Sequence, residues 1–367
     1  MRAVVLADES FAARERALLS RLEIGLVDEG LRVVHAIPVG AESWYQPEVF
    51  SHLVTYAAEG IGFSLRWRVQ KLLKEIRDRS EAVDSDPDII HVFGHPAWEV
   101  AIELARQTRA SLAFEIWSAE LIGPATRLRL PGELPPPVFF VPDPAIERAL
   151  RAEDPGILVR LTPWGVHAST PAREILRPGK AVSVMVDASG RAAAAVKSAL
   201  EGLAAAAVRA PELMIFAESD AIQLAGLWPM VRRFGLADRF TLIPDLEARR
   251  ELSLRGDILC LPDGRGEFRS LTLDAMAAGM LVVASADPLI SILLEGRTAK
   301  LIDKSASERW AAAITWALDD RDAARRLASS AREHIRTTAR PSGHVASVVD
   351  AYEWMTSRES IPFQPPA

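Results

Sequence analysis

The chain is long enough for two domains, because its 367 residues exceed the size at which one hydrophobic core is usual. Hydrophobic residues make up 49% and charged residues 25% of the sequence, a composition typical of soluble globular proteins that excludes a disordered or fibrous chain. The formal net charge is −6 and no basic block occurs, so sequence-independent binding to nucleic acid is not expected.

Short β-branched runs alternate with helical patterns in the first half, which predicts a parallel sheet covered by helices. Between the first two strands, Ser10 is a candidate N-cap, and a helical stripe from Phe11 to Leu26 ends before Gly30. Strands are predicted at 4–6, 31–37, 89–93, 112–116, 138–141 and 158–161, and further helices near 64–79, 97–108 and 144–151.

The same rhythm restarts at Ala181 and predicts a second sheet. Its strands are expected at 182–186, 213–217, 240–243, 258–261 and 281–284, with helices between them. The segment 162–180 is rich in proline and glycine, so it is the best candidate for a hinge. After Ser305 the pattern is helical to about Arg358, with one break at 340–343.

The predicted fold class is α/β, with two Rossmann-like, doubly wound parallel-sheet domains that face a cleft. The N-terminal domain is placed at 1–165 and the C-terminal domain at 166–340. A helix over 341–358 is expected to cross back to the first domain, and the tail 359–367 is expected to be disordered.

Cysteine usage and hydropathy bear on the compartment. The single cysteine, Cys260, cannot form an intrachain disulfide, and its apolar neighbours are typical of a buried strand. Neither a secretory signal nor an uncharged apolar run of about 18 residues is visible in the sequence. We therefore expect a cytoplasmic protein with at most a weak peripheral contact to membranes.

The stretch Gly266–Ser285 is the most informative part of the sequence. A polar, glycine-bearing loop at 263–266 follows a strand and leads into a helix that begins near Ser270 and ends at Gly279. The unpaired N–H groups and the positive dipole end of a helix start suit a phosphate or diphosphate. This stretch resembles the signature of the group 1 family of nucleotide-sugar glycosyltransferases.

The resemblance extends through most of the chain. The segments Pro163–His167, Leu236–Leu246, Asp257–Pro262 and Leu301–Arg332 are similar to the family's hinge, base-side loop, central strand and closing helices. It implies the GT-B fold, a nucleotide diphosphate sugar as donor in the second domain, and transfer with retention to an acceptor in the first. The acceptor is expected to be a saccharide or a lipid-linked one, and neither a metal nor another cofactor is expected.

The family's signature opens and closes with glutamates, and this register gives Gly266 and Asp274 here. Asp274 keeps a carboxylate that can accept hydrogen bonds from a ribose diol. Glu267, shifted by one position, either contacts the donor sugar or is a solvated loop residue. Arg269 stands where the family has a small residue, so it either blocks the phosphate or pairs with it.

The other expected donor and acceptor contacts are also altered. Arg191 is the remnant of a basic pair that clamps the diphosphate, or else a solvated arginine. In the first domain, Phe11-Ala12-Ala13 replaces a glycine pair, and Trp117 replaces a histidine. His95 is a candidate acceptor or donor contact, although a structural histidine is the alternative. Asp84-Ser85-Asp86 sits in a turn-forming loop and is rejected as a metal motif.

These observations give one predicted site and three functional hypotheses. The first is a glycosyltransferase, the second is a catalytically lapsed homologue that binds a nucleotide, a glycan or a protein, and the third is an epimerase of the same fold. The candidate catalytic residues are His95 and Glu267, and the candidate donor-binding residues are Gly165, Arg191, Pro244, Gly266, Arg269, Ser270, Leu271 and Asp274.

The segment 63–79 combines an apolar stripe with a basic surface. Six arginine and lysine residues face only Glu75 and Asp78 on this predicted helix, although the whole chain is acidic. The helix either attracts anionic lipid headgroups or an acidic acceptor, or it packs its stripe on the first sheet and keeps its charges solvated.

Overall fold

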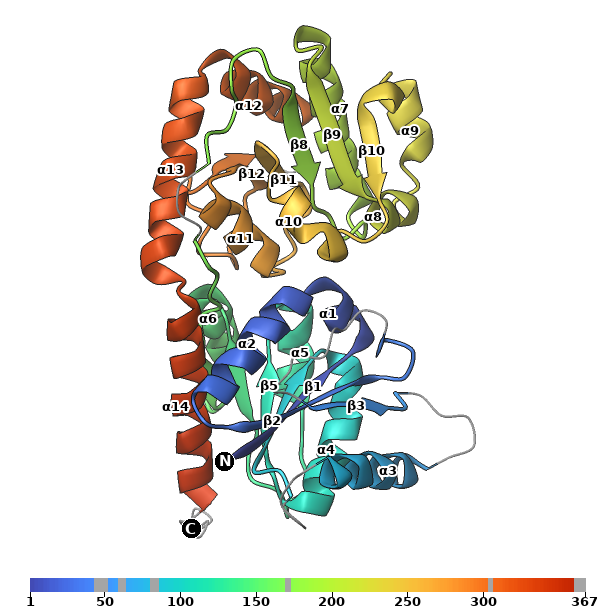
Figure 1. Cartoon of the computed structure of the whole chain (residues 1–367), viewed down its shortest axis with the longest axis vertical. Coiled ribbons are helices and arrows are strands. Elements are labelled where there is room, and N and C mark those ends of the chain that lie inside the picture. The colour runs from blue at the N-terminus through green and yellow to red at the C-terminus, as the bar shows by residue number, and fades with distance from the viewer. Residues whose placement is uncertain (43–51, 59–63, 80–85, 169–172, 303–305, 360–367) are drawn as a thin grey trace. The chain divides into compact units, whose positions relative to one another are not determined.

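The structure is a computed structural model that describes residues 1–42, 52–58, 64–79, 86–168, 173–302 and 306–359. The chain divides into two compact units, one formed by Met1–Gly165 with Pro341–Ala367 and the other by Val166–Arg340. The predicted fold class of two doubly wound parallel sheets is confirmed, since each unit contains one such sheet (Figure 1).

The first unit is built on a seven-stranded parallel sheet with the order β3-β2-β1-β4-β5-β6-β7. The central strand β1 is buried along its whole length, as expected where helices cover both faces of a parallel sheet. The strands are β1 (Arg2–Ala7), β2 (Arg32–Pro38), β3 (His52–Tyr56), β4 (Ile89–Phe93), β5 (Ser111–Glu115), β6 (Val138–Val141) and β7 (Val159–Leu161).

Three local features of the first unit differ from the prediction. The edge strand β3 is absent from the predicted set, and it pairs with β2 from Val34↔His52 to Pro38↔Tyr56. The N-cap after β1 is Asp8 and not Ser10, because the Asp8 carboxylate accepts the Phe11 N–H at 2.7 Å. The first helical stretch is also broken at Glu15. Helices of this unit are α1 (Glu9–Arg14), α2 (Arg16–Asp28), α3 (Leu65–Asp78), α4 (Trp98–Thr108), α5 (Ile122–Arg127) and α6 (Pro144–Glu153).

The last helix, α14 (Pro341–Glu359), belongs to the first unit. It packs against α2, where an added Cβ on Gly25 would lie 2.2 Å from Val345. The Tyr352 hydroxyl and Nδ1 of His91 are 2.8 Å apart, which joins α14 to the buried strand β4. Burial lowers the pKa of His344 to about 3, so this side chain of α14 is neutral at pH 7.

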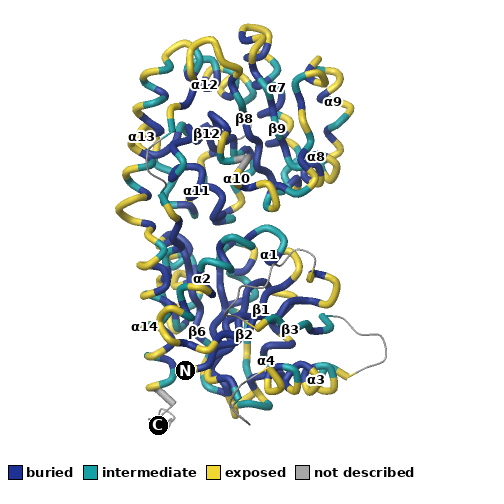
Figure 2. Tube along the Cα trace, viewed as in Figure 1, coloured by how far each residue is buried: buried dark blue, intermediate teal, exposed yellow. Residues whose placement is uncertain are grey.

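The second unit contains a six-stranded parallel sheet with the order β10-β9-β8-β11-β12-β13. Its central strands are buried and appear dark blue in Figure 2. The strands are β8 (Val182–Val186), β9 (Leu213–Glu218), β10 (Phe240–Ile243), β11 (Ile258–Leu261), β12 (Leu281–Ser285) and β13 (Lys300–Ile302).

Two helices of the second unit, α7 and α12, pack closely together. An added Cβ on Gly202 would lie 2.4 Å from the Trp310 Cβ, so glycine allows α7 to approach α12 closely. Trp310 itself is fully buried in the core of this unit. The helices are α7 (Ala193–Arg209), α8 (Ser219–Leu224), α9 (Trp228–Arg233), α10 (Arg250–Ser253), α11 (Ser270–Ala278), α12 (Ser307–Asp319) and α13 (Arg321–Thr338).

Candidate functional site

The strand order of the second sheet reverses between β8 and β11, which is where ligands bind in doubly wound sheets. Asp187 is the first residue after β8, and Asp263 lies just after β11. The loop after β11 leads into α11, whose first residue is Ser270. The topology therefore brings Asp187, Asp263 and the start of α11 to the carboxyl edge of one sheet.

The loop at 263–266 is held in place by carboxylates on both sides. One Asp263 oxygen accepts the Ser189 N–H at 2.9 Å and the Ser189 hydroxyl at 2.6 Å. Asp287, which follows β12, accepts the Gly266 N–H at 2.7 Å. Gly266 has φ 64°, a left-handed conformation that favours glycine, so the family's glutamate would be strained here. Asp287 was missed by the sequence prediction.

Arg269 lies among acidic side chains at the start of α11. Its Nη1 is 3.5 Å from Asp187 Oδ1 and 3.8 Å from Glu267 Oε1, and its side chain is only 9% exposed. Burial raises the pKa of Asp263, and the negative charges of Asp187 and Glu267 raise it further. Asp187 and Glu267 thus both lie within ion-pair distance of the Arg269 guanidinium, and both also act on the nearby Asp263.

Arg250 joins α10 to α11 through a second buried ion-pair network. Its Nη1 donates to both Glu247 oxygens at 2.9 and 2.7 Å, and its Nη2 donates to the Ser270 hydroxyl at 2.7 Å. Its Nε donates to Asp274 Oδ2 at 2.9 Å. The predicted ribose carboxylate, Asp274, is therefore held by a cation that the sequence prediction did not include.

The remaining predicted donor residues lie in different surroundings. Leu271 is 2% exposed among the core residues, whereas Pro244 is exposed after β10. Arg191 is exposed, and its backbone N–H donates to the Ser189 hydroxyl at 3.1 Å, next to the Asp263 loop. Gly165 ends the first unit's main segment. The binding roles of these residues stay predictions.

In the first unit, the strand order reverses between β1 and β4. His95 is exposed just after β4, with its ring 4.8 Å from that of Trp98. Asp8, after β1, is close to Gly94, because an added Cβ there would lie 1.8 Å from Asp8 Oδ2. Burial raises the pKa of Asp8. The catalytic role of His95 stays a prediction.

Two residues of strand β4, Phe93 and His91, belong to an aromatic cluster and to a buried polar network. Phe11 contacts Phe93 and Trp117 at ring distances of 4.9 and 5.4 Å. His91 Nε2 is 3.1 Å from Glu115 Oε2, and Glu115 Oε1 accepts the Trp164 indole N–H at 2.7 Å. His91 is thus a hydrogen-bonded structural histidine.

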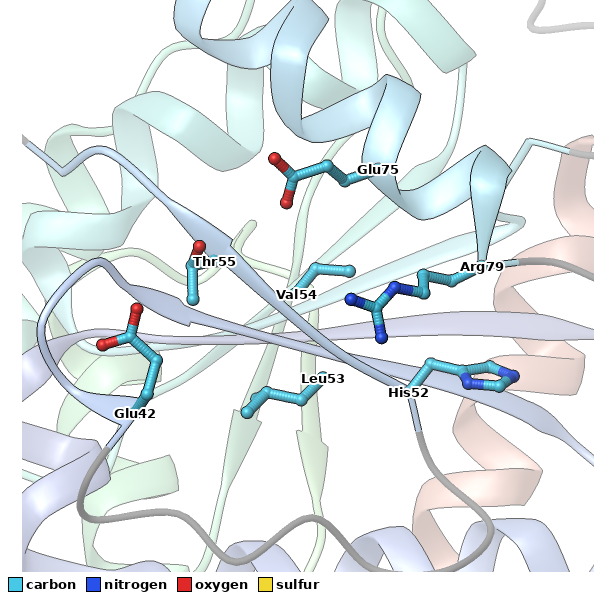
Figure 3. A pocket seen from close by; sticks show the side chains of 7 residues that line it. All are labelled: Glu42, His52, Leu53, Val54, Thr55, Glu75 and Arg79. Carbon is cyan, nitrogen blue, oxygen red and sulfur yellow. The ribbon is translucent and has the colours of Figure 1, made fainter.

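A pocket of about 360 Å³ lies along β3, the edge strand of the first sheet (Figure 3). Strands β2 and β1 lie between β3 and the point where the strand order reverses, between β1 and β4. The pocket is therefore separate from the site expected at that reversal. It is lined by Glu42, His52, Leu53, Val54, Thr55, Glu75 and Arg79.

Neither a metal-binding cluster nor a membrane-spanning helix occurs among the described residues. Within the described ranges, no set of three or more His, Cys, Asp or Glu side chains is arranged to bind a metal ion. Asp84 and Ser85 of the rejected metal motif lie outside those ranges, and Asp86 pairs with Arg77 at 2.7 Å. No helix in the described part of the chain could span a membrane.

Solved structures resemble this chain along nearly its whole length. Sucrose-phosphate synthase from Thermosynechococcus elongatus is 16% identical with a TM-score of 0.71, and the match covers 98% of this chain and 100% of that one. Anabaena Alr3699/HepE in complex with UDP and glucose is 14% identical with a TM-score of 0.69, over 95% and 99% of the two chains. A putative UDP-N-acetylglucosamine 2-epimerase from Listeria monocytogenes is 14% identical with a TM-score of 0.59, over 100% of both.

Residues 229–334 match the family described as Glycosyl transferases group 1. This part of the chain is similar to the group 1 family, and the whole chain has the GT-B fold. No curated protein sequence matches it significantly. The matched range includes the 263–266 loop, α11 and both buried arginines, Arg250 and Arg269.

Proposed function

We propose that the chain is a glycosyltransferase that binds a nucleotide diphosphate sugar at the carboxyl edge of its second sheet. The observation that carries the proposal is the group 1 match over 229–334, because this range includes the loop and helix start at the β8–β11 reversal. The similar fold of a protein solved with UDP and glucose supports the same class of donor.

The proposed reaction transfers a sugar without a protein-bound metal or further cofactor. The bond from the anomeric carbon to the diphosphate oxygen breaks, and a bond to an acceptor hydroxyl oxygen forms as that hydroxyl passes its proton to the leaving diphosphate. Arg269, Arg191 and the positive end of α11 would stabilise the charge on the leaving diphosphate. Glu267 would contact the donor sugar, and Asp274 the ribose. We propose retention at the anomeric carbon.

The acceptor is proposed to be a saccharide or a lipid-linked saccharide bound by the first unit, with His95 as a contact. Basic side chains on the exposed face of α3 support an acidic or membrane-borne acceptor. A cytoplasmic location is part of the same proposal.

Two alternatives are tied to particular observations. The internal ion pairs of Arg250 and Arg269 favour a lapsed homologue that binds without turnover. The fold shared with the Listeria protein favours an epimerase.

One incubation separates these three functions. The full chain is mixed with UDP-glucose or UDP-N-acetylglucosamine, with and without an oligosaccharide acceptor mixture, and followed by NMR. Acceptor-dependent release of UDP supports the transferase, and the anomeric signal of the product tests retention. A change of sugar configuration without release indicates the epimerase. Binding with neither change would contradict the proposed transfer and favour the lapsed homologue.

A further inference from the structure

Asp187 is a buried carboxylate at the reversal point of the second sheet. The residue is 3% exposed, and its backbone N–H donates to the Cys260 carbonyl at 3.0 Å, which fixes its place beside β11. Its Oδ1 is 3.5 Å from Arg269 Nη1, a long contact for an ion pair. A buried carboxylate is costly without a cation, so Asp187 depends on Arg269.

The same cation is the group best placed to bind an incoming phosphate. Arg269 is the N-cap residue of α11, so it stands at the end of the helix where the dipole is positive and an anion is favoured. The nearby carboxylates of Asp187 and Glu267 repel an anion, and both also raise the pKa of Asp263. A diphosphate that recruits Arg269 must therefore compete with Asp187.

We propose that Asp187 sets the diphosphate affinity of this site by acting as an internal counter-ion of Arg269. The inference rests on the proposed function, since it concerns the same donor site. In the absence of ligand the carboxylate neutralises the guanidinium. On binding, the diphosphate takes over Arg269 and leaves Asp187 buried without its cation, so Asp187 lowers the affinity for any diphosphate.

The test is isothermal titration calorimetry of the full chain with UDP, inorganic pyrophosphate and uridine. Asp187→Asn keeps the side-chain shape but removes the charge, so it should bind UDP and pyrophosphate at least about tenfold more tightly than the wild type. Uridine, which has no phosphate, should bind both proteins equally. The gain should disappear in the double variant Asp187→Asn with Arg269→Ala.

Controls separate this effect from net charge and from misfolding. Asp238→Asn removes the same charge from an exposed residue just before β10, at the other edge of the sheet, and should change no affinity. Asp187→Ser is the second variant, and thermal melts establish that each protein is folded.

Each result bears on one of the two proposals. Unchanged or weaker pyrophosphate binding by both Asp187 variants overturns the counter-ion role, and so does tighter binding by Arg269→Ala alone. If pyrophosphate binding tightens as expected but UDP binds to no variant, the counter-ion role stands and the proposed nucleotide donor fails. If UDP binds the wild type and Asp187→Asn equally, only the counter-ion role fails.

Discussion

Arg250 links three side chains where α10 meets the start of α11. Its partners Glu247 and Asp274 are buried carboxylates, with side chains 6% and 8% exposed. Removal of one partner from a buried ion network leaves the opposite charges uncompensated, which is more costly than the net contribution of the network itself. The stability of this region therefore depends on Arg250.

Arg250→Ala should lower the free energy of unfolding by about 3–5 kcal/mol, the usual cost of breaking a buried ion pair. The exposed neighbour Arg249 provides a matched control, since Arg249→Ala should change the free energy of unfolding by no more than about 0.5 kcal/mol. Urea denaturation measures both. Equal effects of the two substitutions would contradict the buried network.

Asp263 gives the site a pH-dependent stability. Because its pKa is raised in the folded state, ionisation opposes folding, and this cost is absent below the unfolded pKa and complete above the folded one. Asp263→Asn keeps an oxygen to accept both Ser189 hydrogen bonds but removes the charge. It should be more stable than the wild type by about 0.5 kcal/mol at pH 7–8, with the difference shrinking towards pH 4. A difference that grows on acidification, in denaturant melts across this range, would contradict the assignment.

The sequence identified some site residues and missed their partners for a physical reason. Arg269 and Asp274 could be found because they lie at fixed spacings around a recognisable helix start. Arg250 and Asp187 lie 24 and 82 residues from their partners Asp274 and Arg269. Such pairs depend on the strand order and carry no local pattern. Gly266 is a position where the sequence shows the change but the structure gives the reason. Its φ of 64° favours glycine over the glutamate of the family's signature.

At the scale of elements, the sequence predicts most strands and the long helices, but not the edge strands β3 and β13 or the break between α1 and α2. The edge strand β3 has only five residues, and its adjacent apolar residues Leu53 and Val54 give no two-residue alternation in the sequence, so it is absent from the predicted set. The break between α1 and α2 at Glu15 leaves the apolar stripe continuous, so periodicity does not reveal it.

Helix α3 shows which of its two faces is available to a partner. Its apolar stripe of Val69, Leu72, Leu73 and Ile76 is buried in the first unit, where the helix packs on β3 and α4, so the interpretation of a packed stripe is confirmed. Arg68 donates to the Ala57 and Ala58 carbonyls at 2.7 and 2.6 Å and has a structural role. The exposed face carries Arg66, Lys71 and Lys74, and Trp67 is 50% exposed.

If this face meets a membrane-borne acceptor, the full chain should bind vesicles that contain anionic lipid, and salt should weaken the binding. Each basic side chain near an anionic surface contributes about 1 kcal/mol, so glutamine at Arg66, Lys71 and Lys74 should reduce binding at least tenfold. Glutamine at the exposed residues Arg148, Arg232 and Arg233 is the control for net charge. Equal vesicle binding by the two triple variants, measured by co-sedimentation, would contradict a specific role for α3.

At the scale of the whole molecule, the division of the chain predicts how its parts fold. Residues 166–340 form a compact unit with their own buried core, so this fragment should melt cooperatively when expressed alone. Residues 1–165 alone lack α14, and with it the Tyr352 partner of His91 and the Val345 contact at Gly25. Calorimetry should show a lower melting temperature for 1–165 than for 1–165 joined by a flexible linker to 341–359. Equal melting temperatures would contradict a stabilising role for α14.

The whole-molecule architecture was predictable because alternating strands and helices leave few topologies for a parallel sheet. The restart of the pattern near Ala181 indicated the second sheet for the same reason. The placement of donor and acceptor in separate units stays a prediction, because it depends on ligands and not on the arrangement of strands.

Binding of a nucleoside diphosphate by the second unit is tested most directly by the thermal stability of the full chain with UDP, GDP or ADP, with the nucleosides as controls. At about 100 times its dissociation constant, the matching nucleotide should stabilise the folded state by about 2.7 kcal/mol, whereas the nucleosides at equal concentration should stabilise it less. Stabilisation by one nucleoside diphosphate above the others is the expected result, and no stabilisation by any of the three at millimolar concentration would contradict this binding.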